Sequence, residues 1–445
     1  MAFSAGQWRI VGAAAMAALV AACGGGGSSN DIASANGDCS TTAQKTWLRS
    51  YMQDRYFWSG TSPNPDPTPE ISVADYFRAL LLPGEGSTNT MHYWSYISDS
   101  AAFNQFFAEG KTLGYGAFVN GVERQAPLKL RFVEDQSPAA RAGLKRGDTI
   151  VSINGRSAAE MFMSQDFGLN PSKEGDQVSI VIDNGAGPQT FTLSAATYTL
   201  TPVSSVKVLD LGGGRKAGYL VLKDFITQAE QPLSAAFASF AQQGATELIL
   251  DLRYNGGGRI STSNVLASLV AGVSKSGVFA QLKYNSKHPE QNVNFMLGGA
   301  TGAGFKRVLV LTGSRTCSAS ELVVNGLKPY VDVVTLGSTT CGKPVGFNPQ
   351  DNCSSTYSAV NFESLNANNQ GRYYDGIAAT CPVAEDFSRA LGDLAEKLTA
   401  AAISYEQAGA CPVASVAERA RALSLPRRTG SQSTEPGERQ GMWAD

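Results

Sequence analysis

The second half of the chain carries three short apolar runs that alternate with segments of helical pattern. The runs are residues 246–252, 307–311 and 331–336, and a further strand is predicted at 217–223. Near-continuous apolar runs suit strands buried on both faces, as in parallel sheets covered by helices. Helices are predicted between them, at 229–243, 261–271 and 318–328. The alternation predicts an α/β core of β-α repeats over residues 215–406.

Two segments of different character precede this core. Residues 40–110 are predicted to be mainly helical, because apolar residues recur at three- and four-residue spacing, and Ser72 is a candidate N-cap. Residues 112–196 change to short β-rich runs separated by Gly, Asn and Asp turns. The tail 424–445 is polar and contains Pro and Gly, so we expect it to be disordered.

The first residues have the pattern of an export signal. Arg9 is followed by an apolar run, residues 10–22, that is shorter than the roughly 20 residues needed to cross a bilayer. Small residues directly before Cys23 resemble a lipobox, in which the thiol is diacylated, and a Gly- and Ser-rich tether follows. Gly24 after this cysteine resembles the pattern for outer-membrane sorting. We therefore predict a lipid-anchored protein of the cell envelope that faces the periplasm or the exterior. An ordinary secretory signal with a coincidental cysteine is the alternative.

Composition excludes several classes of function. The net charge is 36 − 38 = −2 and there are no long basic runs, so nucleic acid is not an expected partner. Only two histidines, His92 and His288, are present, and no Cys-x-x-Cys pair occurs. These counts leave little material for a metal centre, and the serine–lysine chemistry considered below needs no metal and no organic cofactor.

Without Cys23, six cysteines remain. An even number in an exported protein suggests disulfides. The sequence does not choose the pairing, although the short loop from Cys341 to Cys353 is one plausible bond. A catalytic thiol at Cys317 is a competing interpretation. The disulfide candidates are Cys39, Cys317, Cys341, Cys353, Cys381 and Cys411.

Three strings near the ends of the buried strands could together carry out chemistry. They are the glycine turn within 250–258 (LDLRYNGGG), the strand-to-helix junction 316–321 (TCSASE) and the segment 340–346 (TCGKPVG). A serine hydroxyl needs a base before it becomes a good nucleophile. Ser318 begins a predicted helix, and Lys343 has no acid within four residues, a setting compatible with a lowered pKa.

Backbone N–H groups could complete such a site. An acyl-transfer intermediate is stabilised by two N–H groups that point at its oxyanion. The candidates are Gly257 and Ala319, with Gly258 as the substitute for Gly257. Each piece also has an ordinary structural explanation: a plain glycine turn, an N-cap serine and a solvated surface lysine.

Residues 137–156 (SPAARAGLKRGDTIVSINGR) closely resemble the short helix, turn and central strand of a PDZ domain. The resemblance places the carboxylate-binding loop at Gly114, Tyr115 and Gly116, where backbone N–H groups could bind a peptide C-terminus beside a strand edge.

The strings DLRYNGGG, CSASE and GKPVG, in this order behind a PDZ domain, resemble the C-terminal processing (tail-specific) serine peptidase family. The resemblance covers about residues 113–347. It implies a crotonase/ClpP-like β-α spiral, with Ser318 as the nucleophile and Lys343 as the general base. Two departures occur: the chain has Asn-Gly-Gly-Gly where many members have Asn-Pro-Gly-Gly, and Phe347 stands where many have a glutamine that orients the lysine. Asn348 or Gln350 could replace that glutamine, or the enzyme could use a dyad.

The sequence thus predicts an exported serine endopeptidase that acts on polypeptides, with the PDZ domain engaging substrate C-termini or gating the site. A catalytically weak or inactive lipoprotein that binds peptides or apolar ligands on the same fold is the alternative. The sequence does not fix the substrate or the oligomeric state. The predicted parts are a lipoprotein signal peptide (1–22), a flexible tether (23–39), a helical domain (40–111), a PDZ domain (112–198), a catalytic domain (199–423) and a disordered tail (424–445).

Overall fold

The computed structural model describes residues 37–68, 70–87, 93–121, 126–298, 304–413 and 441–444, with Gly441 described by its backbone alone. The predicted signal peptide, Cys23 and most of the tether lie outside the described residues. Within these ranges, no helix has the length and apolar character needed to span a bilayer.

A six-stranded sheet forms the centre of the core, in the order β10-β11-β12-β16-β17-β22. Four neighbouring pairs, from β11 to β22, are parallel, and β10 is antiparallel to β11. The bounds are β10 Val203–Gly212, β11 Arg215–Leu222, β12 Glu247–Asp251, β16 Arg307–Thr312, β17 Asp332–Gly337 and β22 Cys381–Pro382. The predicted α/β core is confirmed, and the four predicted strands agree with β11, β12, β16 and β17 to within two residues.

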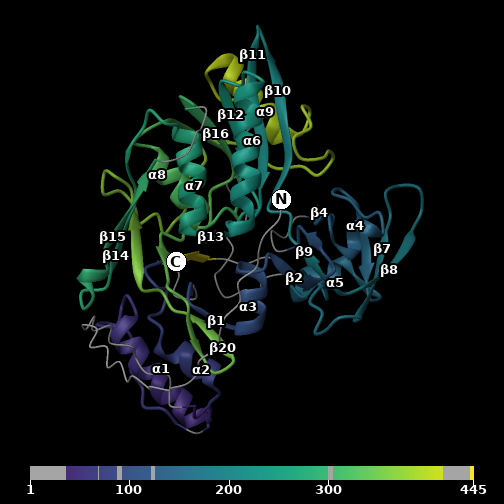
Figure 1. Ribbon diagram of the computed structural model, residues 1–445. Helices are drawn as coiled ribbons and strands as arrows, with labels where there is room; N and C mark the ends of the chain where they lie inside the picture. The colour runs from purple at the N-terminus through teal and green to yellow at the C-terminus, as the bar shows by residue number, and fades with distance from the viewer. Residues whose placement is uncertain are drawn as a thin grey trace, which may run out of the picture. The chain divides into compact units, whose positions relative to one another are not determined.

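Helices cover both faces of this sheet (Figure 1). Along β12, Leu248 and Leu250 pack in one hydrophobic cluster, whereas Ile249 packs in the cluster on the opposite face. Successive side chains of a strand point to opposite faces, so burial of both faces explains the unbroken apolar run. One face is covered by α6 Glu230–Gln242, α7 Ile260–Ala271 and α8 Ala319–Leu327, and the other by α9 Lys397–Ala408.

A second sheet, in the order β15-β14-β21-β18, packs beside α7 and α8. Its last strand, β18, begins two residues after Lys343 in the sequence. A short strand, β13, starts at the predicted glycine turn and continues into α7. The bounds are β13 Gly257–Arg259, β14 Gly277–Tyr284, β15 Val293–Leu297, β18 Val345–Gly346 and β21 Phe362–Leu365, with 3-10 turns at Thr227–Ala229 and Pro289–Gln291.

The segment that resembles a PDZ domain has its own core, which includes Leu130, Ile150 and Ile180. Its largest sheet has the order β6-β5-β7-β8. The elements are β2 Lys111–Gly114, β3 Ala117–Val119, β4 Leu130–Val133, α4 Pro138–Arg141, β5 Ile150–Ile153, β6 Arg156–Ser157, α5 Ala158–Ser164, β7 Gln177–Ile182, β8 Gln189–Ser194 and β9 Ala196–Thr199.

The described residues of the N-terminal segment form three helices. The predicted N-cap is confirmed because Ser72 Oγ accepts a hydrogen bond from the Asp75 N–H at 3.0 Å. The segment is not wholly helical, because it contains strand β1, which pairs with β20 more than 250 residues later in the sequence. Four residues are too few to reveal a strand by periodicity. The bounds are α1 Thr41–Arg55, α2 Val73–Leu80, β1 Tyr96–Asp99, α3 Ser100–Phe107, β19 Gln350–Asn352 and β20 Ser355–Ser358.

Three disulfides join the six predicted cysteines: Cys39–Cys353, Cys317–Cys341 and Cys381–Cys411. The suggested Cys341–Cys353 bond is therefore wrong. Cys317 and Cys341 follow β16 and β17, which are parallel neighbours, so their carboxyl ends meet at one edge of the sheet. Sequence proximity between Cys341 and Cys353 was a poorer guide than this topology.

The prediction of a disordered tail is wrong at its end. Gly441–Trp443 form strand β23, which pairs in parallel with β13. Met442 is fully buried. An apolar pair, Met442 and Trp443, interrupts the polar composition on which that prediction depended. Residues 424–440 lie outside the described residues.

Candidate active site

Ser318 lies at a tight strand-to-helix turn between β16 and α8. Its backbone has a φ of +61° and a ψ of −114°, in a region that residues other than glycine rarely adopt. Such a conformation costs on the order of 1–3 kcal/mol and persists only where surrounding contacts impose it, which is common at functional sites. The turn places Ser318 one residue before α8, at the positive end of that helix.

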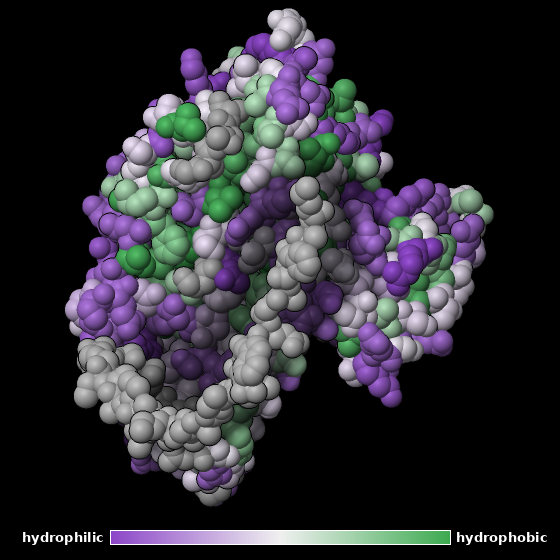
Figure 2. All heavy atoms as spheres, in the orientation of Figure 1, coloured by the Kyte–Doolittle hydropathy of each residue, from purple (hydrophilic) through white to green (hydrophobic). Residues whose placement is uncertain are grey.

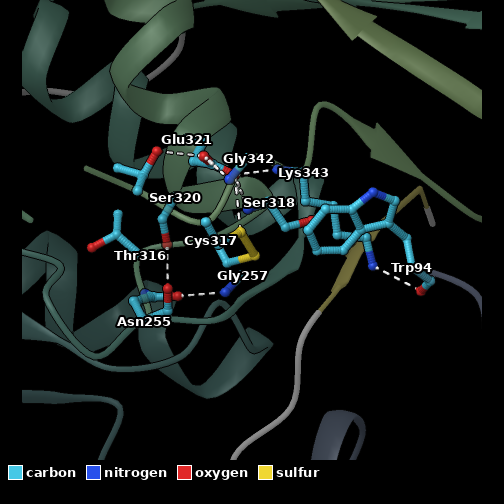
Figure 3. The surroundings of a disulfide bond; sticks show 12 residues. Trp94, Asn255, Gly257, Thr316, Cys317, Ser318, Ser320, Glu321, Gly342 and Lys343 are labelled. Atoms are coloured by element: carbon cyan, nitrogen blue, oxygen red, sulfur yellow. Dashed lines mark hydrogen bonds between the residues drawn. A yellow bond between two sulfur atoms is a disulfide. The ribbon is translucent and has the colours of Figure 1, made fainter. Parts of the chain in front are cut away.

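The contacts that impose this turn converge on Glu321, in the first turn of α8. Its carboxylate accepts hydrogen bonds from the N–H groups of Ser318 at 2.9 Å, Gly342 at 2.8 Å and Lys343 at 2.8 Å, and from the Thr340 hydroxyl. Burial raises the pKa of Glu321 to about 7, against the lowering effect of these donors. One side chain therefore joins the segments of the predicted nucleophile and base (Figure 3).

The Cys317–Cys341 disulfide joins the same two segments covalently. The part of the chain that the structure describes brings Cys317, Cys341 and Glu321 together as a possible metal-binding group. Both sulfur atoms are used in the disulfide, so they are not available as thiolate ligands. The arrangement fits a structural cross-link better than a catalytic thiol or a metal centre.

Lys343 is almost completely buried, with 1% of its surface exposed. Its Nζ donates a hydrogen bond to the Trp94 carbonyl at 3.2 Å and lies 5.0 Å from the centre of the Phe347 ring. Burial lowers the pKa of Lys343 to about 8, although the carboxylates of Glu85 and Glu321 raise it. A lysine in this environment is neutral in a substantial fraction of molecules near neutral pH.

Ser318 and Lys343 are not hydrogen-bonded to each other in the structure. Ser318 Oγ is buried without a hydrogen-bond partner, while Lys343 Nζ is bonded to Trp94. Figure 3 shows the two side chains on the same side of the disulfide. The structure thus brings the two groups into one buried site in a resting arrangement, and proton transfer between them requires the lysine to leave the Trp94 carbonyl.

The predicted oxyanion groups come from two segments, the start of α8 and the glycine turn at the start of β13. Ala319 is the first residue of α8, where N–H groups have no partner within the helix. The Gly257 N–H donates to Asn255 Oδ1 at 2.8 Å, so it is not available in this arrangement. The Asn255 carbonyl accepts from the Cys317 N–H and the Ser320 hydroxyl, both at 3.0 Å. Asn255 therefore connects the glycine turn to the Ser318 turn.

Phe347 occupies the position of the expected glutamine and places its ring against Lys343. Neither predicted substitute fulfils that role in the structure. The Asn348 side chain accepts from Tyr284 Oη at 2.8 Å and donates to the Ala444 carbonyl at 3.1 Å, and Gln350 is exposed. An attraction between an ammonium group and an aromatic face replaces the amide contact.

The N-terminal segment also contributes to this site, which the sequence alone does not reveal. Trp94, Tyr96 and Glu85 precede Lys343 by more than 240 residues, and no local pattern connects them. Glu85 is fully buried and accepts hydrogen bonds from Tyr56 Oη and Ser95 Oγ. Glu321 was part of a noted string, and its position three residues after Ser318 is the spacing of a residue that can bond back to a helix start.

The candidate PDZ loop is ordered by backbone hydrogen bonds. The Tyr115 carbonyl accepts from the Ala139 N–H at 2.9 Å, and the Gly116 carbonyl accepts from the Glu134 N–H at 3.0 Å. Gly114 pairs with Ala196 of β9. Peptide binding at this loop stays a prediction.

On the face drawn in Figure 2, hydrophobic residues of the described chain are interspersed with hydrophilic ones rather than gathered in one continuous patch. The chain is instead characterised by an α/β core, a PDZ-like module and a buried site that contains Ser318 and Lys343. The model of peptidase family S41 matches residues 216–377, a PDZ domain model matches 133–183, and a model of the peptidase S41 N-terminal domain matches 43–96. The chain thus resembles peptidase family S41 in its N-terminal, PDZ and core segments.

Curated relatives carry names that agree with this family. The carboxyl-terminal-processing protease of Synechocystis sp. is 27% identical over 54% of this chain and 55% of its own length. The carboxy-terminal processing protease CtpA of Bacillus subtilis is 29% identical over 46% of this chain and 42% of its own. The chain thus spans about half the length of these relatives. A solved S41 protease from Bacteroides fragilis superposes with a TM-score of 0.63 at 23% identity, covering 82% of this chain and 97% of that one, which shows a shared fold.

Proposed function

We propose that this protein is a serine endopeptidase that hydrolyses peptide bonds in polypeptides, with Ser318 as the nucleophile and Lys343 as the general base. The observation that supports it most is a buried lysine with a lowered pKa beside a serine held in a strained strand-to-helix turn. The match to the peptidase family S41 model and the similarity to relatives named carboxyl-terminal processing proteases also support the proposal.

The proton transfers follow from the environment of Lys343. With a pKa of about 8, about one tenth of the molecules carry a neutral amine at pH 7. The neutral amine turns from the Trp94 carbonyl to Ser318 Oγ and takes its proton as Oγ bonds to the substrate carbonyl carbon. The ammonium then gives this proton to the leaving amine as the C–N bond breaks. A water molecule hydrolyses the acyl-enzyme by the same steps and frees Ser318.

The oxyanion requires donors within the same site. The Ala319 N–H lies at the positive end of α8, and either Gly258 or a Gly257 N–H released from Asn255 supplies the second donor. Preorganised donors of this type contribute about 3–4 kcal/mol each to acyl transfer. Gly258 has a φ of +133°, and a Cβ there would lie 2.1 Å from the Phe225 carbonyl oxygen, so this position requires glycine.

The test compares Ser318→Ala and Lys343→Ala with the parent chain on an unfolded protein substrate and on a serine-directed fluorophosphonate. Both variants should lose cleavage, and Ser318→Ala should lose labelling. Lys328→Ala, which removes an exposed lysine at the end of α8, is the matched control and should keep both activities. Cleavage at the parental rate by either site variant defeats the mechanism. A parent chain that binds peptides but does not label supports the binding protein instead.

We further propose that the protein is exported and anchored by a lipid on Cys23, and that its PDZ domain engages substrate C-termini. Three disulfides suit an oxidising compartment. Cys23→Ala should move the protein from the membrane fraction to the soluble fraction of a Gram-negative host. An unchanged distribution argues against lipid anchoring.

Recognition of substrate C-termini by the PDZ loop is tested by comparing the binding of a peptide with that of its C-terminal amide. Equal binding of the two argues against carboxylate recognition.

A further inference from the structure

The C-terminal strand β23 lies between two segments that carry candidate site residues. On one side it pairs in parallel with β13, where Gly257 faces Gly441 and Gly258 faces Met442. On the other side it forms a parallel bridge between Trp443 and Phe347. We call the space between β13 and Phe347 the strand slot.

Main-chain hydrogen bonds hold β23 in the strand slot. The Phe347 N–H donates to the Met442 carbonyl at 2.9 Å, and the Ala444 N–H donates to the Phe347 carbonyl at 3.3 Å. Asn348 Nδ2 donates to the Ala444 carbonyl at 3.1 Å. Bonds of this kind read only the backbone, so they would accept any extended polypeptide.

Side-chain sites in the slot add a preference for apolar and aromatic residues. Met442 is fully buried in the main hydrophobic cluster. The Trp443 ring packs edge-on against Phe103 at 5.8 Å and Phe107 at 5.6 Å, and the Arg259 guanidinium lies 4.6 Å from its centre. An apolar residue followed by an aromatic one therefore fits this slot, as it does in the tail itself.

The slot adjoins the groups proposed for catalysis. Gly257 and Gly258, the candidate oxyanion donors, are the first two residues of β13. Phe347 is bonded to the tail through its backbone, and its ring lies 5.0 Å from Lys343 Nζ. A polypeptide in the slot thus lies next to both the oxyanion turn and the base.

We propose that the strand slot is a peptide-binding site of the peptidase, that the chain's own residues 441–444 occupy it in this structure, and that substrate segments with an apolar–aromatic pair displace them. The tail is then a built-in competitor of the substrate. A strand of three residues makes few contacts, but attachment to the same chain gives it a high effective concentration. The cleavage part of this proposal rests on the proposed function, whereas the binding part does not.

The first experiment measures binding without catalysis. All chains are full length and carry Ser318→Ala, and the probe is a fluorescent peptide of residues 437–445 (GERQGMWAD). A chain that also carries Met442→Asp and Trp443→Ala has a weakened tail and should bind the probe at least ten-fold more tightly than the chain with its native tail. A probe with the same two substitutions should bind at least ten-fold more weakly. The matched control is Val413→Asp, at a fully exposed position before the tail, which should change nothing.

The second experiment measures catalysis with Ser318 present. The tail variant should cleave an unfolded protein substrate several-fold faster at low substrate concentration, with KM lowered and kcat unchanged, and the native probe should inhibit it competitively. The proposal is overturned if the chain with its native tail and the chain with the substituted tail bind the probe equally tightly. A lowered thermal midpoint together with lost activity and no probe binding shows instead that β23 is a permanent part of the core. Trp443→Ala alone, which leaves the strand backbone and Met442 in place, is the milder variant if the double substitution prevents folding.

Discussion

The pH dependence of the reaction tests the proposed base most sharply. Burial lowers the pKa of Lys343 from 10.5 to about 8 against the opposing effect of the Glu85 and Glu321 carboxylates, a net change of about 3 kcal/mol between the two protonation states. The neutral fraction then rises from about one tenth at pH 7 to about one half at pH 8 and about nine tenths at pH 9. The rate at low substrate concentration should therefore rise about five-fold from pH 7 to 8, about two-fold from 8 to 9, and level off above.

A lysine with its ordinary pKa gives a different curve. Its neutral fraction rises about ten-fold for each pH unit from 7 to 9 and does not level off there. The assay is kcat/KM for an unfolded protein substrate, together with the second-order rate of fluorophosphonate labelling, from pH 6 to 10. A slope of ten-fold per pH unit through pH 9, or no dependence on pH, refutes the assignment of Lys343 as a buried base.

Substitution of Glu85 should shift the midpoint of this pH profile in a direction that the structure fixes. The Glu85 carboxylate raises the pKa of Lys343, so Glu85→Gln should lower that pKa and move the midpoint of the profile to lower pH. Glu321→Gln should move it in the same direction for the same reason. Because the pKa of Glu321 is itself raised to about 7, the parent profile can contain a second, more acidic step, and this variant removes it. A structural defect alone would lower the rate without moving the midpoint.

Two further predictions concern the surroundings of the dyad. Replacing Cys317 and Cys341 with serine should lower the free energy of unfolding by about 2–4 kcal/mol and reduce fluorophosphonate labelling at least ten-fold, because the bond joins the segments of nucleophile and base. The same replacement at Cys381 and Cys411 should lower stability but leave labelling intact, and equal labelling loss in both pairs contradicts the positioning role. Phe347→Gln should raise the pKa of the neighbouring lysine, since an amide oxygen accepts a hydrogen bond from the ammonium form, and shift the pH profile upward; an unchanged midpoint contradicts this.

The sequence predicted the parts of the fold in which burial is visible locally. A strand buried on both faces reads as an apolar run, so residues 307–311 were recognised as the strand Arg307–Thr312, and residues 318–328 as the helix Ala319–Leu327. Strands β1 and β23 were missed, because three or four residues show no periodicity and their partners lie far away in the sequence. The pairing of the cysteines was missed for a similar reason, since it depends on which strands are neighbours.

The candidate site was predicted in the same uneven way. Ser318 and Lys343 lie in recognisable strings at the ends of successive strands, and the topology brings such ends together. The strained backbone of Ser318 and the hydrogen bonds around Glu321 could not be predicted, because they depend on three segments meeting in space. The contact between Lys343 and the Trp94 carbonyl could not be predicted either, because every residue has a backbone carbonyl and none is marked in the sequence as an acceptor.

The N-terminal segment forms part of the environment that lowers the pKa of the proposed base, Lys343. Trp94 and Tyr96 contribute the carbonyl and an aromatic ring near Lys343, and this segment is fixed to the core by β1–β20 pairing and by the Cys39–Cys353 bond. Without it, Lys343 would be open to water on that side and its pKa would return toward 10.5. At pH 7 the neutral fraction of such a lysine is lower by about 300-fold than at a pKa of about 8. Chains in which the N-terminal segment has not yet docked should therefore be nearly inactive even though Ser318, Lys343 and Glu321 all belong to the core.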